Sequence, residues 1–295
     1  MALNPWESCL LGTHPWNRDA HEKKVVSVSW RSWVVPTGVS EWAALRSKDL
    51  THFDDSGGSW AAAQAQSFGY DANEILIKVQ ASTKAVLRGD AAFERDGVAF
   101  ASSEYRWPVL AGLLEVAARE SELKVLDFGG SLGSLYWQHQ KFFAGLNVSW
   151  GVVEQPEFVT AGNKLNQNFI GFFPSVTDYL KLETPNVVIL SSVLQYLPNP
   201  EQILHELLST PANTVILDRT PMSATVSNIP CLQVVPQHIY AGSYPAWVFS
   251  KDWLQTQLAG WEILAEFDGI EPEGRTKRGI HFAWDGLIAR RKNNG

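Results

Sequence analysis

The residues with the clearest chemical role form a glycine-rich turn, Asp127–Gly133, with the sequence Asp-Phe-Gly-Gly-Ser-Leu-Gly. An apolar run precedes the turn, and a segment typical of a helix follows it. In an open α/β sheet, such a turn lets the backbone approach a cofactor at the carboxyl end of a strand. A dinucleotide fingerprint would need glycine at positions 129, 131 and 134, but Ser131 and Ser134 occupy two of them. The spacing therefore argues against a simple dinucleotide site.

Two further carboxylates have positions typical of cofactor contacts. Glu154 follows the apolar run 149–153, roughly twenty residues after the glycine turn, where a carboxylate can hold both hydroxyls of a ribose. The alternative is a surface acid that begins the next helix, where the helix dipole stabilises it. Asp178 lies where an adenine amine could be contacted, and an ordinary Thr-Asp turn explains it equally well.

The other candidate cofactor residues are acidic, small or glycine residues near strand ends. Asp127 orders the glycine turn, binds the amino-acid end of a cofactor, or does both. Ser191 and Ser192 follow a buried apolar run, and they either lie near the reacting group or cap a helix. The complete set of candidate cofactor residues is Asp127, Gly129, Gly130, Ser131, Gly133, Glu154, Asp178, Ser191 and Ser192.

Residues outside this corner could hold or activate a second reactant. His238, among polar aromatic residues, is the candidate general base, although a lone histidine is more often structural. His139 faces either the site or the packing side of its helix. Arg219, beside Asp218, forms either an ion pair or an anion clamp. The residues assigned to the second reactant are Tyr105, His139, Arg219, Tyr240 and Tyr244. Tyr105 and Arg106 could also form part of a lid over the cofactor. The segment 93–96 could do the same or fasten the N-terminal lobe by ion pairs.

The elements that must position these residues alternate between strand and helix. The apolar runs predict strands at 123–128, 148–153, 186–191 and 213–218, with helices at about 133–144, 156–167 and 199–209. This βαβ repetition predicts an α/β fold with a doubly wound, mostly parallel sheet. Two final strands, at 261–267 and 282–289, predict an antiparallel hairpin that closes a seven-stranded sheet.

The N-terminal part of the chain differs from this pattern. Residues 1–60 hold six of the thirteen tryptophans, and a capped amphipathic helix is predicted from Asp71 to Gly89. Tryptophans bury large areas, so we expect them to pack on the core or on a second subunit. We predict a Trp-rich, helical lobe at 1–104 and an α/β core at 105–295. The N-terminal segment is the candidate interface of a homodimer.

The composition and charge of the chain argue against several classes of function. The 295 residues carry a net charge of −7 with both signs interspersed, and they lack the basic stripe that nucleic-acid binding requires. The two cysteines and the isolated histidines predict neither a disulfide framework nor a metal site. The sequence shows neither an apolar run of about 20 residues nor a secretory signal, which predicts a cytoplasmic protein without a membrane span.

Six separated motifs occur in an order that resembles a known family. They are Gly69–Asp71, Phe93–Asp96, Leu126–Gly133, Ser192–Leu197, Asp218–Pro221 and Ser243–Trp247. The acid-x-Gly-Gly-Ser-x-Gly turn resembles the first motif of Rossmann-like (class I) S-adenosylmethionine-dependent methyltransferases. Together the motifs resemble a bacterial family of methyltransferases that is often associated with surface-polysaccharide gene clusters. The resemblance spans residue 60 to the end and implies S-adenosylmethionine as the cofactor.

The resemblance implies the reaction class, methyl transfer. Our leading hypothesis is a biosynthetic methyltransferase that acts on a small molecule or a glycan intermediate, with oxygen methylation ahead of nitrogen or carbon methylation. Two other function classes stay open. One is an NAD(P)-dependent oxidoreductase on the same fold, against which the missing glycine weighs. The other is a non-catalytic partner protein with a vestigial cofactor pocket. The fold does not identify the methyl acceptor.

Overall fold

A computed structural model describes residues 52–68, 72–165, 168–235 and 242–292. The chain divides into two compact units, Met1–Trp33 and Val34–Gly295, and every described residue belongs to the second. The boundary predicted between residues 104 and 105 lies inside this second unit. Within the described part of the chain, no helix combines the length and the apolar character needed to cross a membrane.

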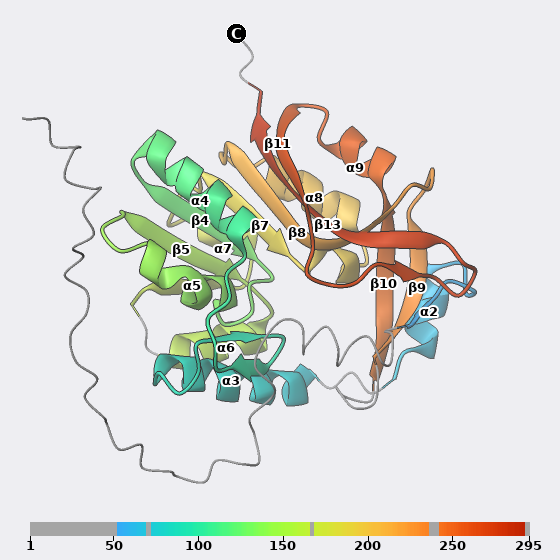
Figure 1. Ribbon diagram of the computed structural model, residues 1–295, viewed down its shortest axis with the longest axis horizontal. Coiled ribbons are helices and arrows are strands. Elements are labelled where there is room, and N and C mark those ends of the chain that lie inside the picture. Colours follow the sequence, from blue (N-terminus) through green and yellow to red (C-terminus); the bar gives the residue numbers. More distant parts are fainter. Residues whose placement is uncertain (1–51, 69–71, 166–167, 236–241, 293–295) are drawn as a thin grey trace, which may run out of the picture. The chain divides into compact units, whose positions relative to one another are not determined.

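Over the described residues, the centre of this unit is an eleven-stranded sheet. Its mostly parallel part (Figure 1) has its strands in the order β6-β5-β4-β7-β8-β13-β11. Their bounds are β4 Leu123–Phe128, β5 Val148–Val153, β6 Ile170–Phe173, β7 Val187–Ser191, β8 Thr214–Ser223, β11 Trp261–Asp268 and β13 His281–Arg291. The pairs of β13 with β8 and with β11 are antiparallel, and the pairs among the other five strands are parallel. The predicted α/β class, with C-terminal antiparallel strands, is confirmed.

Helices cover both faces of this sheet because its strands point alternate apolar residues to opposite sides (Figure 1). On one face, Val125 and Ile189 share a hydrophobic cluster with α4 and α5. On the other face, Leu126 and Leu190 share a cluster with α7, α8 and α9. The bounds of these helices are α4 Trp107–Glu120, α5 Ser134–His139, α7 Val176–Leu180, α8 Pro200–Leu208 and α9 Lys251–Gln257.

Most predicted elements of the core are confirmed, with shifts at their ends. The strands at 123–128 and 148–153 have the predicted bounds, whereas the strand predicted at 213–218 continues to Ser223. The helix predicted at 133–144 is wrong in its second half, because α5 gives way to a 3-10 turn at Gln140–Phe142. The helix predicted at 156–167 is α6, Pro156–Lys164. The sequence pattern did not predict β6 or α7.

An antiparallel extension, also unpredicted, continues the sheet from the end of β8. Its strands are β10 Gly242–Ser250, β9 Ile229–Val235 and β1 His52–Asp54. β10 pairs with β8 only through Phe249 and Ser250, so the extension branches from the carboxyl end of β8. Helix α2, Trp60–Gln66, lies on this extension, and its cap Ser59 accepts the N–H of Ala62.

Two elements precede the core and lie against it. Helix α3 extends over Ala72–Leu87, close to the predicted limits. A separate hairpin follows, formed by β2, Phe93–Arg95, and β3, Val98–Phe100. The hairpin contacts α3 and α5, so it lies beside the segment that follows the glycine turn.

Candidate functional site

The strand order reverses between β4 and β7, and backbone strain is concentrated at the carboxyl ends of the strands around this point. Five non-glycine residues in the described ranges have positive φ, and three of them lie at this edge. Ser131 follows β4 with φ 57°, Ser192 follows β7 with φ 55°, and Arg219 has φ 54° in β8. Such conformations cost free energy and cluster at functional sites. In open α/β sheets, ligands bind in the crevice at this reversal.

The glycine turn after β4 wraps closely around the carboxylate of Asp127. A Cβ atom on Gly130 would overlap the Asp127 side chain, and one on Gly129 would overlap Val193, which follows β7. Gly129 also has φ 69°, a conformation that glycine adopts without strain. The turn therefore needs glycine at both positions, and it holds β4 against the end of β7.

Asp127 is buried at the end of β4. Trp150 Nε1 donates a hydrogen bond to its Oδ2 at 3.1 Å. Burial raises the pKa of Asp127 from its ordinary value of 3.8 to about 7, and the nearby charge of Glu154 adds to this increase. Near neutral pH, this carboxyl group is therefore poised between its two protonation states.

Glu154 joins the end of β5 to the glycine turn. Its Oε1 accepts the N–H of Ser131 at 3.2 Å, and its Oε2 accepts the N–H of Gln155 at 2.7 Å. Burial raises the pKa of Glu154, while the two main-chain hydrogen bonds oppose the increase. The structure thus brings Asp127, the glycine turn and Glu154 together at the ends of two adjacent strands.

The two serines after β7 are tied to β8. Ser191 Oγ donates to Asp218 Oδ2 at 2.8 Å, and the N–H of Ser192 donates to the main-chain oxygen of Asp218 at 2.9 Å. Ser192 Oγ accepts a bond from Gln195 Nε2 at 3.2 Å. Both serines are partly exposed at the carboxyl edge of the sheet.

The side chain of Asp178 is held by local contacts at the N-terminus of α7. Ser175 caps α7, accepting the N–H of Asp178, and its hydroxyl donates to Asp178 Oδ2 at 2.6 Å. Lys181 binds the other oxygen at 2.7 Å, and these bonds, the one from Lys181 first, lower the pKa of Asp178. The adenine contact assigned to this residue stays a prediction.

Arg219 belongs to a buried ion-pair network. Its guanidinium binds Asp96 and Glu271, each at 2.7 Å. Arg219 lies in a bulge of β8, because Asp218 and Arg219 together face the single residue Gly286 of β13, and this bulge explains the positive φ of Arg219. Of the two alternatives for Arg219, the structure shows the ion pair, and two carboxylates already balance its charge.

His139 occupies the packing position rather than a position facing a second reactant. The ring is fully buried. Its Nε2 accepts the N–H of Arg106 at 3.0 Å, and its Nδ1 therefore donates to the oxygen of Leu135 at 2.8 Å. Burial lowers the pKa of His139 to about 4, so the ring is neutral. The substrate contact predicted for His139 is not the arrangement found, because main-chain groups use both ring nitrogens.

The remaining candidates for the second reactant are only partly described. Tyr105 packs against Trp107 and Phe142, and a hydrogen bond from Lys141 is the main cause that lowers its pKa. Tyr244 in β10 meets the ring of Tyr196 edge to face, with ring centres 5.2 Å apart. His238 and Tyr240 lie outside the described residues.

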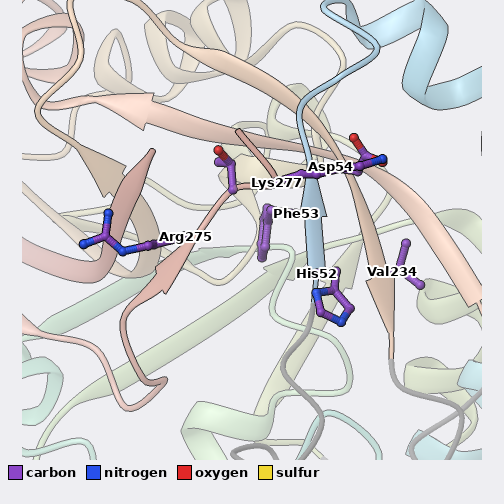
Figure 2. A pocket seen from close by; sticks show the side chains of 7 residues that line it. His52, Phe53, Asp54, Val234, Arg275 and Lys277 are labelled. Atoms are coloured by element: carbon purple, nitrogen blue, oxygen red, sulfur yellow. The ribbon is translucent and has the colours of Figure 1, made fainter. Parts of the chain in front are cut away.

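A cavity of about 420 Å³ lies at the outer strands β1 and β9 (Figure 2). It is lined by His52, Phe53, Asp54, Val234, Arg275, Thr276 and Lys277. Lys277 pairs with Asp54 at 2.6 Å, and their hydrogen bond is the main cause that lowers the pKa of Asp54 to about 2. None of the predicted site residues lines this cavity.

No protein-family model and no curated protein sequence matches the chain. Several solved structures resemble its fold. The N-terminal domain of EvdMO1, solved with SAH and D-fucose, is 13% identical with a TM-score of 0.44, over 71% of this chain and 97% of that one. The glycopeptide N-methyltransferase MtfA, complexed with S-adenosyl-L-methionine, is 10% identical with a TM-score of 0.42, over 61% and 92%. The amino pentose methyltransferase CalS10 of Micromonospora echinaspora is 12% identical with a TM-score of 0.40, over 71% and 96%. At these values the similarity carries no argument about function.

Sequence reasoning missed two of the buried acids that the structure places around the crevice. Glu271 follows β11 in a loop, and no periodic or motif signal marked it. Glu94 belongs to the segment 93–96, which we expected to form a lid or to attach the N-terminal lobe by ion pairs. We predicted no individual role for Glu94. It is fully buried, and it accepts bonds from the hydroxyl of Ser134 and from the N–H of Gly97. Burial raises the pKa of Glu94 to about 7.

The raised pKa of Asp127 predicts a pH dependence of stability. The folded state keeps a proton between about pH 4 and pH 7 that the unfolded state has lost, so this group destabilises the fold as pH rises through that window. Asp127→Asn removes the ionisable group and with it this decrease in the free energy of unfolding. Relative to the parent, the variant should gain stability between about pH 5 and about pH 8, by at most about 3 kcal/mol, because the folded state keeps its proton over about two pH units of this interval.

Urea unfolding at the two pH values measures this difference. Glu206→Gln, an exposed substitution on α8, is the control and should show the same pH dependence as the parent. A profile for Asp127→Asn that runs parallel to the parent would contradict the prediction.

Proposed function

We propose that this protein is an S-adenosylmethionine-dependent methyltransferase that acts on a small molecule or a glycan intermediate, with oxygen methylation favoured over nitrogen or carbon methylation. The observation that carries the proposal is the corner formed by the acid-x-Gly-Gly-Ser-x-Gly turn and Glu154 at the reversal of strand order. The motif resemblance to a family associated with surface-polysaccharide gene clusters is what suggests a glycan acceptor.

The residues of this corner fit the cofactor. The two oxygens of Glu154 each accept one main-chain N–H, and a carboxylate has about four acceptor sites, so it can also bind two ribose hydroxyls. Gly130 lets the backbone of the turn pass close to Asp127, because a Cβ atom there would overlap the carboxylate. Asp127, beneath the turn, would bind the amino group at the amino-acid end.

When bound, S-adenosylmethionine supplies a methyl group on a positively charged sulfur. The protein then has to align the acceptor with this methyl and exclude water. We assign the alignment to the edge formed by Ser191 and Ser192, with Tyr105, Tyr240 and Tyr244 toward the acceptor. His238 is the proposed base that takes the proton of the acceptor hydroxyl.

The proposal predicts saturable binding of S-adenosylmethionine and S-adenosylhomocysteine in a calorimetric titration. NAD and NADP serve as comparison ligands, because an oxidoreductase on this fold would bind one of them. Titrations with neither heat nor a thermal shift for the two sulfur compounds would count against a methyltransferase.

Glu154→Ala is expected to weaken S-adenosylhomocysteine binding by about 10- to 100-fold, because hydrogen bonds to a charged group are lost. Glu157→Ala is the matched control, since Glu157 is an exposed acid three residues away on α6. The same titration measures both variants. An affinity for Glu154→Ala equal to that of the control would remove Glu154 from the ribose site.

A further inference from the structure

Gln195 occupies a buried position beside the proposed methyl-transfer site. It lies in the 3-10 turn η3, Leu194–Tyr196, which follows β7 directly, and none of its surface is exposed. Its Nε2 donates to Ser192 Oγ at 3.2 Å and to the main-chain oxygen of Arg219 at 3.5 Å. Both partners have positive φ and lie at the carboxyl edge of the sheet.

The carbonyl oxygen of this amide is unpaired. No described residue donates a hydrogen bond to Gln195 Oε1, although the atom is buried. Exchanging the nitrogen and the oxygen would place two carbonyl oxygens against each other at Arg219, so the orientation is fixed by its neighbours. A buried acceptor without a donor costs free energy, which a donor from a bound ligand would recover.

The arginines near Gln195 are already bound by carboxylates. Arg219 binds Asp96 and Glu271, and Arg106 binds Asp218. Each of these guanidinium groups therefore has its charge compensated by carboxylates. A phosphate or carboxylate entering this edge would have to displace one of these partners, whereas a neutral group would not.

An aromatic face continues from Gln195. Tyr196 follows it in the chain and meets Tyr244 of β10 edge to face. Both rings are partly exposed. Aromatic rings of this kind pack well against the apolar face of a sugar ring while their hydroxyls stay polar.

We infer that Gln195 determines acceptor specificity: its Oε1 accepts a hydrogen bond from a hydroxyl of the methyl acceptor, and that acceptor is a neutral pyranose ring. The inference rests on the proposed function and deepens it. A donor from the acceptor satisfies the one unpaired atom of the amide, and the two amide hydrogen bonds hold Gln195 in place for it. An analogue that lacks the bonded hydroxyl would leave Oε1 unpaired again and would be rejected.

The test uses the full chain saturated with S-adenosylhomocysteine, and it measures pyranoside binding by saturation-transfer NMR titration. The probes are methyl α-D-glucopyranoside, its monodeoxy analogues, glucuronate and glucose 6-phosphate. We expect the neutral pyranoside to bind more tightly than both charged sugars, and at least one monodeoxy analogue to bind about tenfold more weakly. These probes need no variant, so the outcome does not depend on folding.

Gln195→Met tests the residue itself, because methionine keeps the length of the side chain and removes the amide. It should weaken pyranoside binding by about tenfold and leave S-adenosylhomocysteine affinity within about twofold. Thr83→Val is the matched control. Thr83 in α3 also has a buried oxygen without a partner among the described residues, and its removal should leave pyranoside binding unchanged.

The inference is overturned if no neutral pyranoside binds, if a charged sugar binds more tightly, or if Gln195→Met binds the pyranoside as the parent does. Failure of the parent to bind S-adenosylhomocysteine is a different result, because it overturns the proposed function. Separate titrations, one with pyranosides and one with S-adenosylhomocysteine, therefore distinguish the two failures.

Discussion

Arg106→Ala is expected to lower the free energy of unfolding by about 3–5 kcal/mol, the range for removing one partner of a buried ion pair. Arg106 binds both carboxylate oxygens of Asp218, and the Asp218 side chain is completely buried. Without the guanidinium, Asp218 keeps the hydroxyl of Ser191 as a side-chain donor. A buried carboxylate with so little compensation is costly, and the variant should unfold at a much lower urea concentration.

An exposed ion pair provides the control for this prediction. Arg88 and Asp90 are bonded at 2.8 Å, but their side chains are 63% and 52% exposed. Arg88→Ala should therefore change the free energy of unfolding by less than about 1 kcal/mol. Adding Asp218→Asn to Arg106→Ala should recover part of the loss, because the uncompensated charge is removed. Equal losses for Arg88→Ala and Arg106→Ala would show that the buried pair does not stabilise this edge.

The sequence pattern predicted the central strands because they are buried on both faces and read as continuous apolar runs. β4 and β7 are of this kind, and their positions were found to within a residue. β6 was missed because it has four residues and includes Gly171, and α7 was missed because five residues are too short to show a helical period. The extension formed by β9 and β10 was also missed. The pairing of Phe249 with Met222 joins residues that no local pattern connects.

The same distinction between local and distant contacts decides which residues of the candidate site could be predicted from the sequence. The glycine turn and its acid are neighbours in the chain, so spacing alone indicated them. Arg219 is different, because its partners Asp96 and Glu271 lie 123 and 52 residues away. Sequence could name an ion pair as one alternative for Arg219, but it could not identify the acids. For His139, the deciding contact is with a main-chain N–H, which leaves no signal in residue type.

Gly130→Ala is expected to abolish S-adenosylhomocysteine binding, with a loss of about 100-fold or more. The added methyl would overlap the carboxylate of Asp127, which is buried and fixed by Trp150. Asp127 cannot move away without breaking that bond, so the turn must shift instead. A shifted turn separates the N–H of Ser131 from Glu154, and the ribose and amino-acid contacts of the proposed cofactor site are lost together.

The control for this variant separates a local change in the turn from a general effect of replacing glycine. Gly260→Ala adds the same methyl where no atom lies within 4 Å and where φ is not left-handed. It should bind S-adenosylhomocysteine as the parent does. If Gly130→Ala is folded by circular dichroism and still binds with an affinity within about twofold of the parent, the turn does not contact the cofactor. If it is folded and does not bind, the close approach of Gly130 to Asp127 is what makes this corner a binding site.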